Sequence, residues 1–385
     1  MSKHALLSAS GAKRWMACTP SARLEERFDE VRSVYADEGT FAHQYAENIL
    51  KRATDMITQK QFSDRRGRLR KNEFYSQSLE DYIETYASIV LERRTKDAIV
   101  MLESKLDYSR WVEDGFGTGD VIIINDGLLE IIDLKYGAGI PVSAIDNPQL
   151  RLYALGALDA FECLYDVQVV RMTIIQPRLD SISSEDMSIK ELHEWAENEV
   201  VPKAKLAFEG KGDFAAGDHC RWCKLKATCR HRADDNLQLA QFDFKTCELL
   251  DDNEIGEILR KAEQLQVWAR DVWGYAFEQA LKGKKWDGWK LVEGRGTRKY
   301  TDENAIVEIL TAEGFKDDDI FSKKLQGITA VEKLLGKKRF EDMLSNYVHK
   351  PKGSPSLVPS DDKRPEINSS ESAVADFAED DDFLT

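Results

Sequence analysis

The chain has 385 residues, of which 42% are hydrophobic, and it carries a net charge of -15. That length is enough for two or three domains with hydrophobic cores of their own. The acidic balance argues against a uniformly basic surface but still allows a local basic channel that binds nucleic acid. Apolar runs fall short of the ~20 residues that cross a bilayer, and the first residues lack the apolar segment of a signal peptide. We therefore expect a cytoplasmic protein with no membrane partner.

Helical periodicity dominates the first hundred residues. Apolar residues recur at helical spacing over 6–28, 37–50 and 79–96, which predicts a helix in each range. Residues 59–74 are polar and interrupted by Gly67, so we predict an exposed loop there. Such a loop can contact a DNA backbone or can simply be solvated. Its candidate nucleic-acid-binding residues are Arg65, Arg66, Arg68, Arg70 and Lys71.

The middle of the chain changes from helical to strand patterns and back. Apolar, β-branched runs separated by the turn signals EDGFG and NDG predict an antiparallel meander of three strands. A helix, a further strand and a second helix follow. The predicted strands are 98–108, 118–126, 128–136 and 167–177, and the predicted helices are 147–161 and 189–208. This order indicates an α/β protein whose mixed sheet is flanked by helices.

The composition changes again in the last third. Residues 236–350 show mostly helical patterns, whereas residues 351–385 are rich in Pro, Ser and Asp and predict a disordered acidic tail. We therefore expect a domain at 1–235, a helical C-terminal region and the tail. The closing ADFAEDDDFLT is suited to mimic DNA, to dock onto a single-strand-binding or recombination protein, or simply to keep the chain in solution.

Charged residues interrupt the apolar pattern where two predicted strands end. Asp133 and Lys135 follow an apolar run, and Asp120 lies on the preceding strand across the NDG turn. Strand pairing brings the two carboxylates close together, where they repel unless a cation lies between them. Mg²⁺ and Mn²⁺ accept such oxygen ligands. Lys135 points to the same face as Asp133 because residues two apart in a strand share a face. Glu103, one strand earlier, is a further candidate ligand.

Two helical motifs accompany these residues in a fixed order. GTFAH ends in His43, and NPQLRLY contains Gln149 and Tyr153. The ordered set G-x-x-x-H, G-x-x-D, D-x-K and Q-x-x-x-Y resembles the RecB-like branch of the PD-(D/E)XK nuclease superfamily. The resemblance covers about residues 5–235 and implies a restriction-endonuclease-like mixed sheet.

The resemblance also implies a role for each motif residue. Lys135 is then the catalytic lysine that assists the attack of water on a phosphodiester, and Gln149 and Tyr153 orient the lysine and the DNA backbone. The implied ligands of a Mg²⁺ or Mn²⁺ ion are His43, Asp120, Asp133 and the carbonyl of Leu134.

Three cysteines lie close together after this region. Cys220, Cys223 and Cys229 have the spacing C-x₂-C-x₅-C, which is typical of ligands for zinc or an iron–sulfur cluster. The fourth ligand is open between Cys18, His219 and His231. Several RecB-like nucleases, among them AddB and CRISPR-associated exonucleases, have one cysteine before the nuclease core and three after it. That likeness implies a [4Fe–4S] cluster on Cys18, Cys220, Cys223 and Cys229, with Zn²⁺ as the alternative.

These inferences lead to one expected function and two alternatives. We expect a metal-dependent DNA exonuclease that hydrolyses phosphodiester bonds from DNA ends, and the resemblance suggests phage replication or recombination in a bacterial host cytoplasm. One alternative is a nucleic-acid-binding or assembly factor that does not cleave. The other is a nuclease that trims DNA for CRISPR adaptation.

Overall fold

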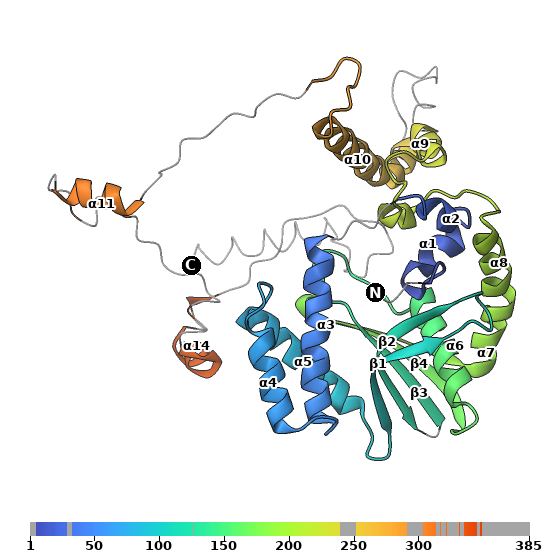
Figure 1. The fold of residues 1–385 in the computed structure, drawn as a ribbon, viewed down its shortest axis with the longest axis horizontal. Coiled ribbons are helices and arrows are strands. Elements are labelled where there is room, and N and C mark those ends of the chain that lie inside the picture. Colours follow the sequence, from blue (N-terminus) through green and yellow to red (C-terminus); the bar gives the residue numbers. More distant parts are fainter. Residues whose placement is uncertain are drawn as a thin grey trace, which may run out of the picture. The chain divides into compact units, whose positions relative to one another are not determined.

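Figure 1 shows the computed structural model of the chain. The chain divides into two units, residues 1–286 and 287–385. The structure describes the ranges 5–28, 33–125, 127–238, 252–290, 303–312 and 335–344, together with residues 316, 321, 331, 347 and 348. The predicted acidic tail, 351–385, lies outside the described residues.

A five-stranded mixed sheet forms the centre of the first unit. Its strands lie in chain order, and all neighbours are antiparallel except β3 and β4, which are parallel and joined through helix α6. The strands are β1 (Ile99–Asp107), β2 (Phe116–Asn125), β3 (Gly127–Leu134), β4 (Val167–Gln176) and β5 (Ser181–Ser188). The predicted mixed sheet flanked by helices is therefore confirmed.

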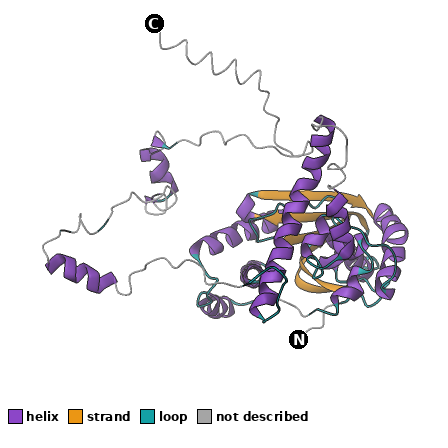
Figure 2. Cartoon of the chain, turned by 90° about the horizontal axis from the view of Figure 1, so that it is seen from above, coloured by secondary structure: helices purple, strands orange, loops and turns teal. Residues whose placement is uncertain are grey.

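Helices cover both faces of this sheet (Figures 1 and 2). In β2, Val121 and Ile123 join the core that contains helices α3 and α5, while Ile122 and Ile124 join the core that contains α6. This alternation is the period of two that a strand buried on both faces requires. The helices on the two faces are α3 (Val34–Ala53) and α5 (Gln77–Arg93), and opposite them α6 (Pro148–Phe161), α7 (Ile189–Trp195), the π-helical η3 (Ala196–Val200) and α8 (Val201–Glu209).

Local signals fix where β3 and α6 begin, and both elements carry residues of the site. Gly127 begins β3 with a φ of 89°, a conformation that glycine adopts without strain. At the other end, the Asn147 side chain accepts hydrogen bonds from the backbone N–H groups of Gln149 and Leu150, and Pro148 occupies the first helical turn. This cap determines where α6 begins and so places Gln149 in its first turn.

The N-terminal segment is joined to the region around residue 220 by bonds that need no metal. Arg14 forms an ion pair with the buried Glu25 at 2.8 Å, and Glu25 accepts the backbone N–H of Lys224 at 2.7 Å. Thr19 donates to the carbonyl of Lys211 at 2.6 Å. The elements involved are η1 (Ala9–Gly11), α1 (Ala12–Ala17), α2 (Ser21–Glu25) and η4 (Asp218–Trp222).

Three expectations about the elements were wrong or incomplete. The helix predicted at 6–28 is three short helices, η1, α1 and α2, and residues 18–20 separate the last two. The predicted loop at 59–74 contains a helix, α4 (Gln59–Leu69), which begins with a capping box between Thr58 and Gln61. Strand β5 was not predicted, because its sequence SISSEDMS is polar and its residues alternate between half-buried and exposed, as at the edge of a sheet. A strand at the edge of a sheet buries little of its surface, so β5 needs few apolar residues to form.

A buried carboxylate holds α4 in place. Glu80 is fully buried in α5, and its carboxylate contacts Arg66, accepts from Arg70 at 2.8 Å and accepts from the Tyr75 hydroxyl at 2.6 Å. No residue of α4 is buried, so this ion cluster, rather than an apolar stripe, fastens the helix. Burial by itself raises the pKa of Glu80, but its hydrogen bonds outweigh burial and lower the pKa to about 2.

Beyond the sheet, the described chain is helical. Helix α10 contacts α9 through an ion pair between Arg232 and Asp271 at 2.7 Å. The predicted boundary after residue 235 stays a prediction. None of the described helices is long and apolar enough to span a membrane. The remaining elements are η2 (Pro177–Leu179), α9 (Arg230–Leu237), α10 (Asp252–Leu281) and, in the second unit, α11 (Glu303–Ala312) and α14 (Lys337–Leu344).

We predict that Glu80→Gln destabilises the protein by about 3 kcal/mol, because it leaves the paired arginines without their buried partner. The folded-state pKa of Glu80 lies below its ordinary value of 4.5. Its contribution is therefore fully present above pH about 4.5 and is lost as the pH falls towards 2. Denaturant unfolding between pH 7 and 3 should show a smaller acid loss in the variant than in the wild type. Glu84→Gln, at an exposed side chain of the same helix, is the control, and equal stability of both variants would contradict the prediction.

Candidate active site

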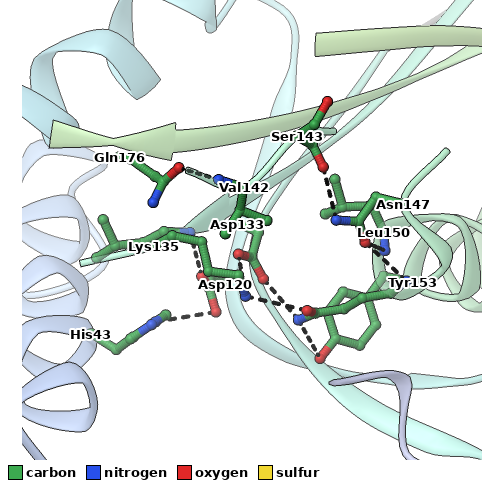
Figure 3. Close-up of polar contacts among 12 residues, drawn as sticks. His43, Asp120, Asp133, Lys135, Val142, Ser143, Asn147, Leu150, Tyr153 and Gln176 are labelled. Atoms are coloured by element: carbon green, nitrogen blue, oxygen red, sulfur yellow. Dashed lines mark hydrogen bonds and ion pairs between the residues drawn. The ribbon is translucent and has the colours of Figure 1, made fainter. Parts of the chain in front are cut away.

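The candidate site lies where strands β2 and β3 separate. Their pairing runs as far as Val121 and Ile132, and beyond it the Asp120 carboxylate accepts the backbone N–H of Leu134 at 2.7 Å. A side chain thus replaces the carbonyl that a regular ladder would supply. The strand end therefore stays hydrogen-bonded while the backbones diverge, and the second oxygen of Asp120 is directed towards α3 (Figure 3).

Three side chains from three elements form a possible metal site at this point. His43 Nδ1 on α3 lies 3.3 Å from Asp120 Oδ1 and 4.0 Å from Glu103 Oε1. One ligand atom from each of these residues lies within 4.8 Å of the other two. All three side chains remain partly exposed, so an ion and its water ligands can reach them. An imidazole with two carboxylates suits Mn²⁺, and the oxygens suit Mg²⁺.

Glu103 is held in an unusual backbone conformation. Its φ of 48° is in the left-handed region, which a residue other than glycine rarely adopts within a strand. The strand register places it directly opposite Asp120, between the pairs Leu102–Val121 and Ser104–Gly119. Like charges opposite one another in an antiparallel pair are destabilising. Backbone strain and charge repulsion at one position are expected of a site that is organised for a ligand rather than for stability.

The charges of the site shift its proton affinities. Burial lowers the pKa of His43, but Asp120 outweighs burial and raises that pKa to about 9. Burial and the charge of Asp120 raise the pKa of Glu103 to about 7. His43 is therefore an imidazolium at neutral pH in the absence of a cation, and it neutralises part of the acidic charge.

A second network surrounds Asp133 (Figure 3). Lys135 Nζ lies 2.7 Å from Asp133 Oδ2 and donates to Gln149 Oε1 at 3.2 Å. Gln149 Nε2 donates to Asp133 Oδ1 at 3.0 Å and lies 3.5 Å from the Tyr153 hydroxyl. Burial lowers the pKa of Lys135, but Asp133 and then Asp120 outweigh it and raise the pKa, so the lysine is a cation. Gln149 bridges the acid and the base of this pair.

The structure brings the predicted catalytic residues together at one end of the sheet. The possible metal site contains Glu103 in addition to His43 and Asp120. From the sequence, Glu103 was only a further candidate ligand. Asp133 is engaged by Lys135 and Gln149 and is outside the three closest ligand atoms. Its role as a ligand, and that of the Leu134 carbonyl, stay predictions. Gln176 was missed: its buried amide accepts from Val142 and donates to Ile140, and so holds the loop that leaves Lys135.

A second potential site lies among the cysteines. One cavity is lined by all four cysteines that are predicted to be ligands, although Cys18 is about 200 residues from the other three. The four are Cys18, Cys220, Cys223 and Cys229. His219 also lines it, but its Nε2 is hydrogen-bonded to the carbonyl of Ala215 at 2.9 Å. The ring of His231 lies against Phe214 instead. Burial raises the pKa of Cys220, which lies near Cys18 and Cys229.

Within the described ranges, three potential ligand atoms lie within 4.8 Å of one another only at His43, Glu103 and Asp120. The cysteine sulfurs are therefore further apart than that in any set of three. The choice between zinc and an iron–sulfur cluster stays a prediction.

The basic residues of α4 divide into two sets. Arg66 and Arg70 are bound to Glu80 and help fasten the helix, so their first role is structural. The other three, Arg65, Arg68 and Lys71, lie on the part of α4 and its C-terminal end that is not committed to Glu80. A DNA contact at these three positions stays a prediction.

The fold and the site define an α/β protein with a candidate metal centre at the open end of a mixed sheet. A family described as "Protein of unknown function (DUF2800)" matches residues 4–365. The chain therefore belongs to this family. A solved structure titled "Crystal structure of SSO0001" matches 56% of this chain and 95% of its own length, with 15% sequence identity and a TM-score of 0.25.

We predict that Asp120→Asn and His43→Ala each weaken Mn²⁺ binding by roughly tenfold or more, since each removes a ligand atom of the triad. Titration followed by electron paramagnetic resonance of free Mn²⁺ measures the affinity directly. Glu47→Gln is the control, because Glu47 lies one turn from His43 on the same helix and is paired with Lys51. Wild-type affinity in both triad variants would show that the ion binds elsewhere.

Proposed function

We propose that this protein is a metal-dependent DNA nuclease of the RecB-like type, with DNA ends as its substrate. The observation that carries the proposal is the position of a His–Glu–Asp triad beside an ion pair, Asp133–Lys135, that a glutamine holds in place. A cation site next to a fixed ammonium suits phosphodiester hydrolysis, because negative charge accumulates on the phosphate in the transition state. The motif order in the sequence supports the same proposal.

Each residue of the site has a part in this reaction. His43, Glu103 and Asp120 would hold a Mg²⁺ or Mn²⁺ ion, with Asp133 beside them. When bound, the ion supplies positive charge that stabilises the developing phosphorane and makes water a better nucleophile. Lys135 places its ammonium where it can attract the scissile phosphate and orient the attacking water. Gln149 fixes the lysine, and Asp133 keeps the lysine charged.

We further propose that the four-cysteine cavity holds a [4Fe–4S] cluster, with Zn²⁺ as the alternative. The proposal is supported by the four cysteines that line one cavity, since four thiols are a donor set for such a cluster as well as for zinc. When bound, the cluster links residues near the N-terminus to residues beyond 220. It would reinforce the contacts that Arg14, Thr19 and Glu25 already make.

The acidic tail and the basic residues of α4 complete the proposal. Arg65, Arg68 and Lys71 would contact the DNA backbone, and the tail at 351–385 would engage a single-strand-binding or recombination protein. A setting in phage replication or recombination within a bacterial cytoplasm rests on the sequence resemblance alone.

Protein purified without oxygen is expected to be coloured and to contain about four iron atoms and about four sulfides per chain. Cys18→Ser should lose this iron, because one of the four ligands is removed. Cys163→Ser should keep it, since Cys163 is exposed and does not line the cavity. Metal analysis and visible absorption decide the result. One zinc per chain with no sulfide would contradict the iron–sulfur assignment.

With Mg²⁺ or Mn²⁺ present, the wild type is expected to degrade linear DNA and to leave covalently closed circles intact. Asp133→Asn and Lys135→Ala should each reduce the rate by about 10²–10³-fold. The lysine variant lacks the ammonium that acts on the phosphate, and the aspartate variant lacks the partner that keeps the lysine charged and in place. Gel analysis of nucleotide release provides the measurement. Lys51→Ala removes a lysine from α3 that is paired with Glu47 outside the site, and it should cleave normally.

Two other results would change the functional assignment. Cutting of closed circles would indicate an endonuclease. Binding of DNA by a wild-type protein that does not cleave it would favour a non-cleaving nucleic-acid-binding factor.

A further inference from the structure

Helix α6, which provides Gln149 and Tyr153, lies unusually close to the β1–β2 hairpin. A Cβ atom on Gly156 of α6 would come within 3.0 Å of the carbonyl oxygen of Asp107 in β1. From the other side, a Cβ atom on Gly117 of β2 would lie only 2.6 Å from Cε1 of Tyr153. Gly117 is the first residue of the G-x-x-D motif that ends in Asp120, and the proposed chemistry leaves it without a role.

The contact at Gly117 involves the functional edge of the tyrosine. Besides Cε1, the Cζ and hydroxyl atoms of Tyr153 would lie 3.4 Å from the added Cβ. The Tyr153 ring is only 7% exposed and belongs to the core on the α6 side of the sheet. Because that core is close-packed, the ring cannot turn away without displacing its neighbours. A methyl group at position 117 therefore moves the tyrosine hydroxyl.

The tyrosine hydroxyl in turn adjoins the residue that connects the catalytic pair. It lies 3.5 Å from Gln149 Nε2, and the same amide group contacts both Asp133 and Lys135. Tyr153 and Gln149 are four residues apart on α6, so they share one face and move together. A displacement at Tyr153 reaches the ammonium of Lys135 through a single intermediate side chain.

We infer that Gly117 is a positioning residue: the absence of a side chain there lets Tyr153 seat against β2 and so holds Gln149 in contact with Asp133 and Lys135. This inference rests on the proposed nuclease function for its catalytic consequence, but the contact itself does not. The glycine is required for close approach and not for backbone conformation, since its φ is outside the left-handed region.

The test is a double-mutant cycle with Gly117→Ala and Tyr153→Ala. In the wild-type background, Gly117→Ala should lower kcat on linear DNA by about 10–100-fold and change KM little, because a small misplacement of a catalytic group slows the chemical step. In the Tyr153→Ala background, the same substitution should change kcat by less than about twofold, since the clash is gone. Thermal unfolding of the same four proteins should show the same coupling in Tm.

Gly119→Ala is the matched control on the same strand. Its added Cβ would meet Cδ1 of Leu106 at 2.8 Å, and the end of that aliphatic side chain can move away. Gly119→Ala is therefore expected to lower Tm without the loss of kcat.

Each result of the cycle has a definite meaning. Coupling in both Tm and kcat supports the inference. An equal loss of kcat with and without Tyr153 would show that Gly117 does not act through the tyrosine, and coupling in Tm with an unchanged kcat would overturn the positioning role. If the wild type does not cleave linear DNA, the proposed function fails, and the Tm cycle alone still decides whether the contact exists.

Discussion

Repulsion among three carboxylates at one end of the sheet is the constraint that organises this molecule. Glu103, Asp120 and Asp133 come from three consecutive strands. Asp120 is stabilised by a backbone N–H and by His43, and Asp133 by Lys135. One cationic partner comes from helix α3 and the other from the end of β3. Part of the acidic charge is therefore neutralised only when α3 is docked on the sheet, which links the packing of the helical layer to the chemistry.

Much of the sheet could be predicted from its sequence, because apolar, β-branched runs with a turn between them specify a hairpin by local rules. The parts that were missed depend on tertiary contacts. Helix α4 has no buried residue and contains Gly67, so its hydrophobic pattern is weak. Its stability depends instead on an ion pair with Glu80, which lies outside the helix. Strand β5 is polar because it lies at an edge of the sheet and alternate residues along it are exposed. Neither feature has a local signal of sufficient strength.

In the candidate site too, some features could be predicted from the sequence and others depend on tertiary contacts. The order of the motifs and the family that they resemble led to the selection of His43, Asp120, Lys135 and Gln149. Spacing could not show that Glu103 adopts a left-handed conformation opposite Asp120, since that depends on the pairing of two strands. The contact between Gly117 and Tyr153 was also out of reach, because it joins a strand to a helix more than thirty residues away.

The contacts between the N-terminal segment and the region around residue 220 have a consequence for the order in which the chain folds during synthesis. Cys18 leaves the ribosome about 200 residues before Cys220. At roughly 5–20 residues per second, that separation corresponds to roughly 10–40 s. During this interval Thr19 lacks Lys211, Glu25 lacks Lys224, and Cys18 lacks the three cysteines that share its cavity. Leu7, Ala12 and Trp15 can pack onto the α6 side of the sheet before then, because they belong to the same core as α6. The contacts of Thr19 and Glu25 with the region around residue 220 form only once that region has been made.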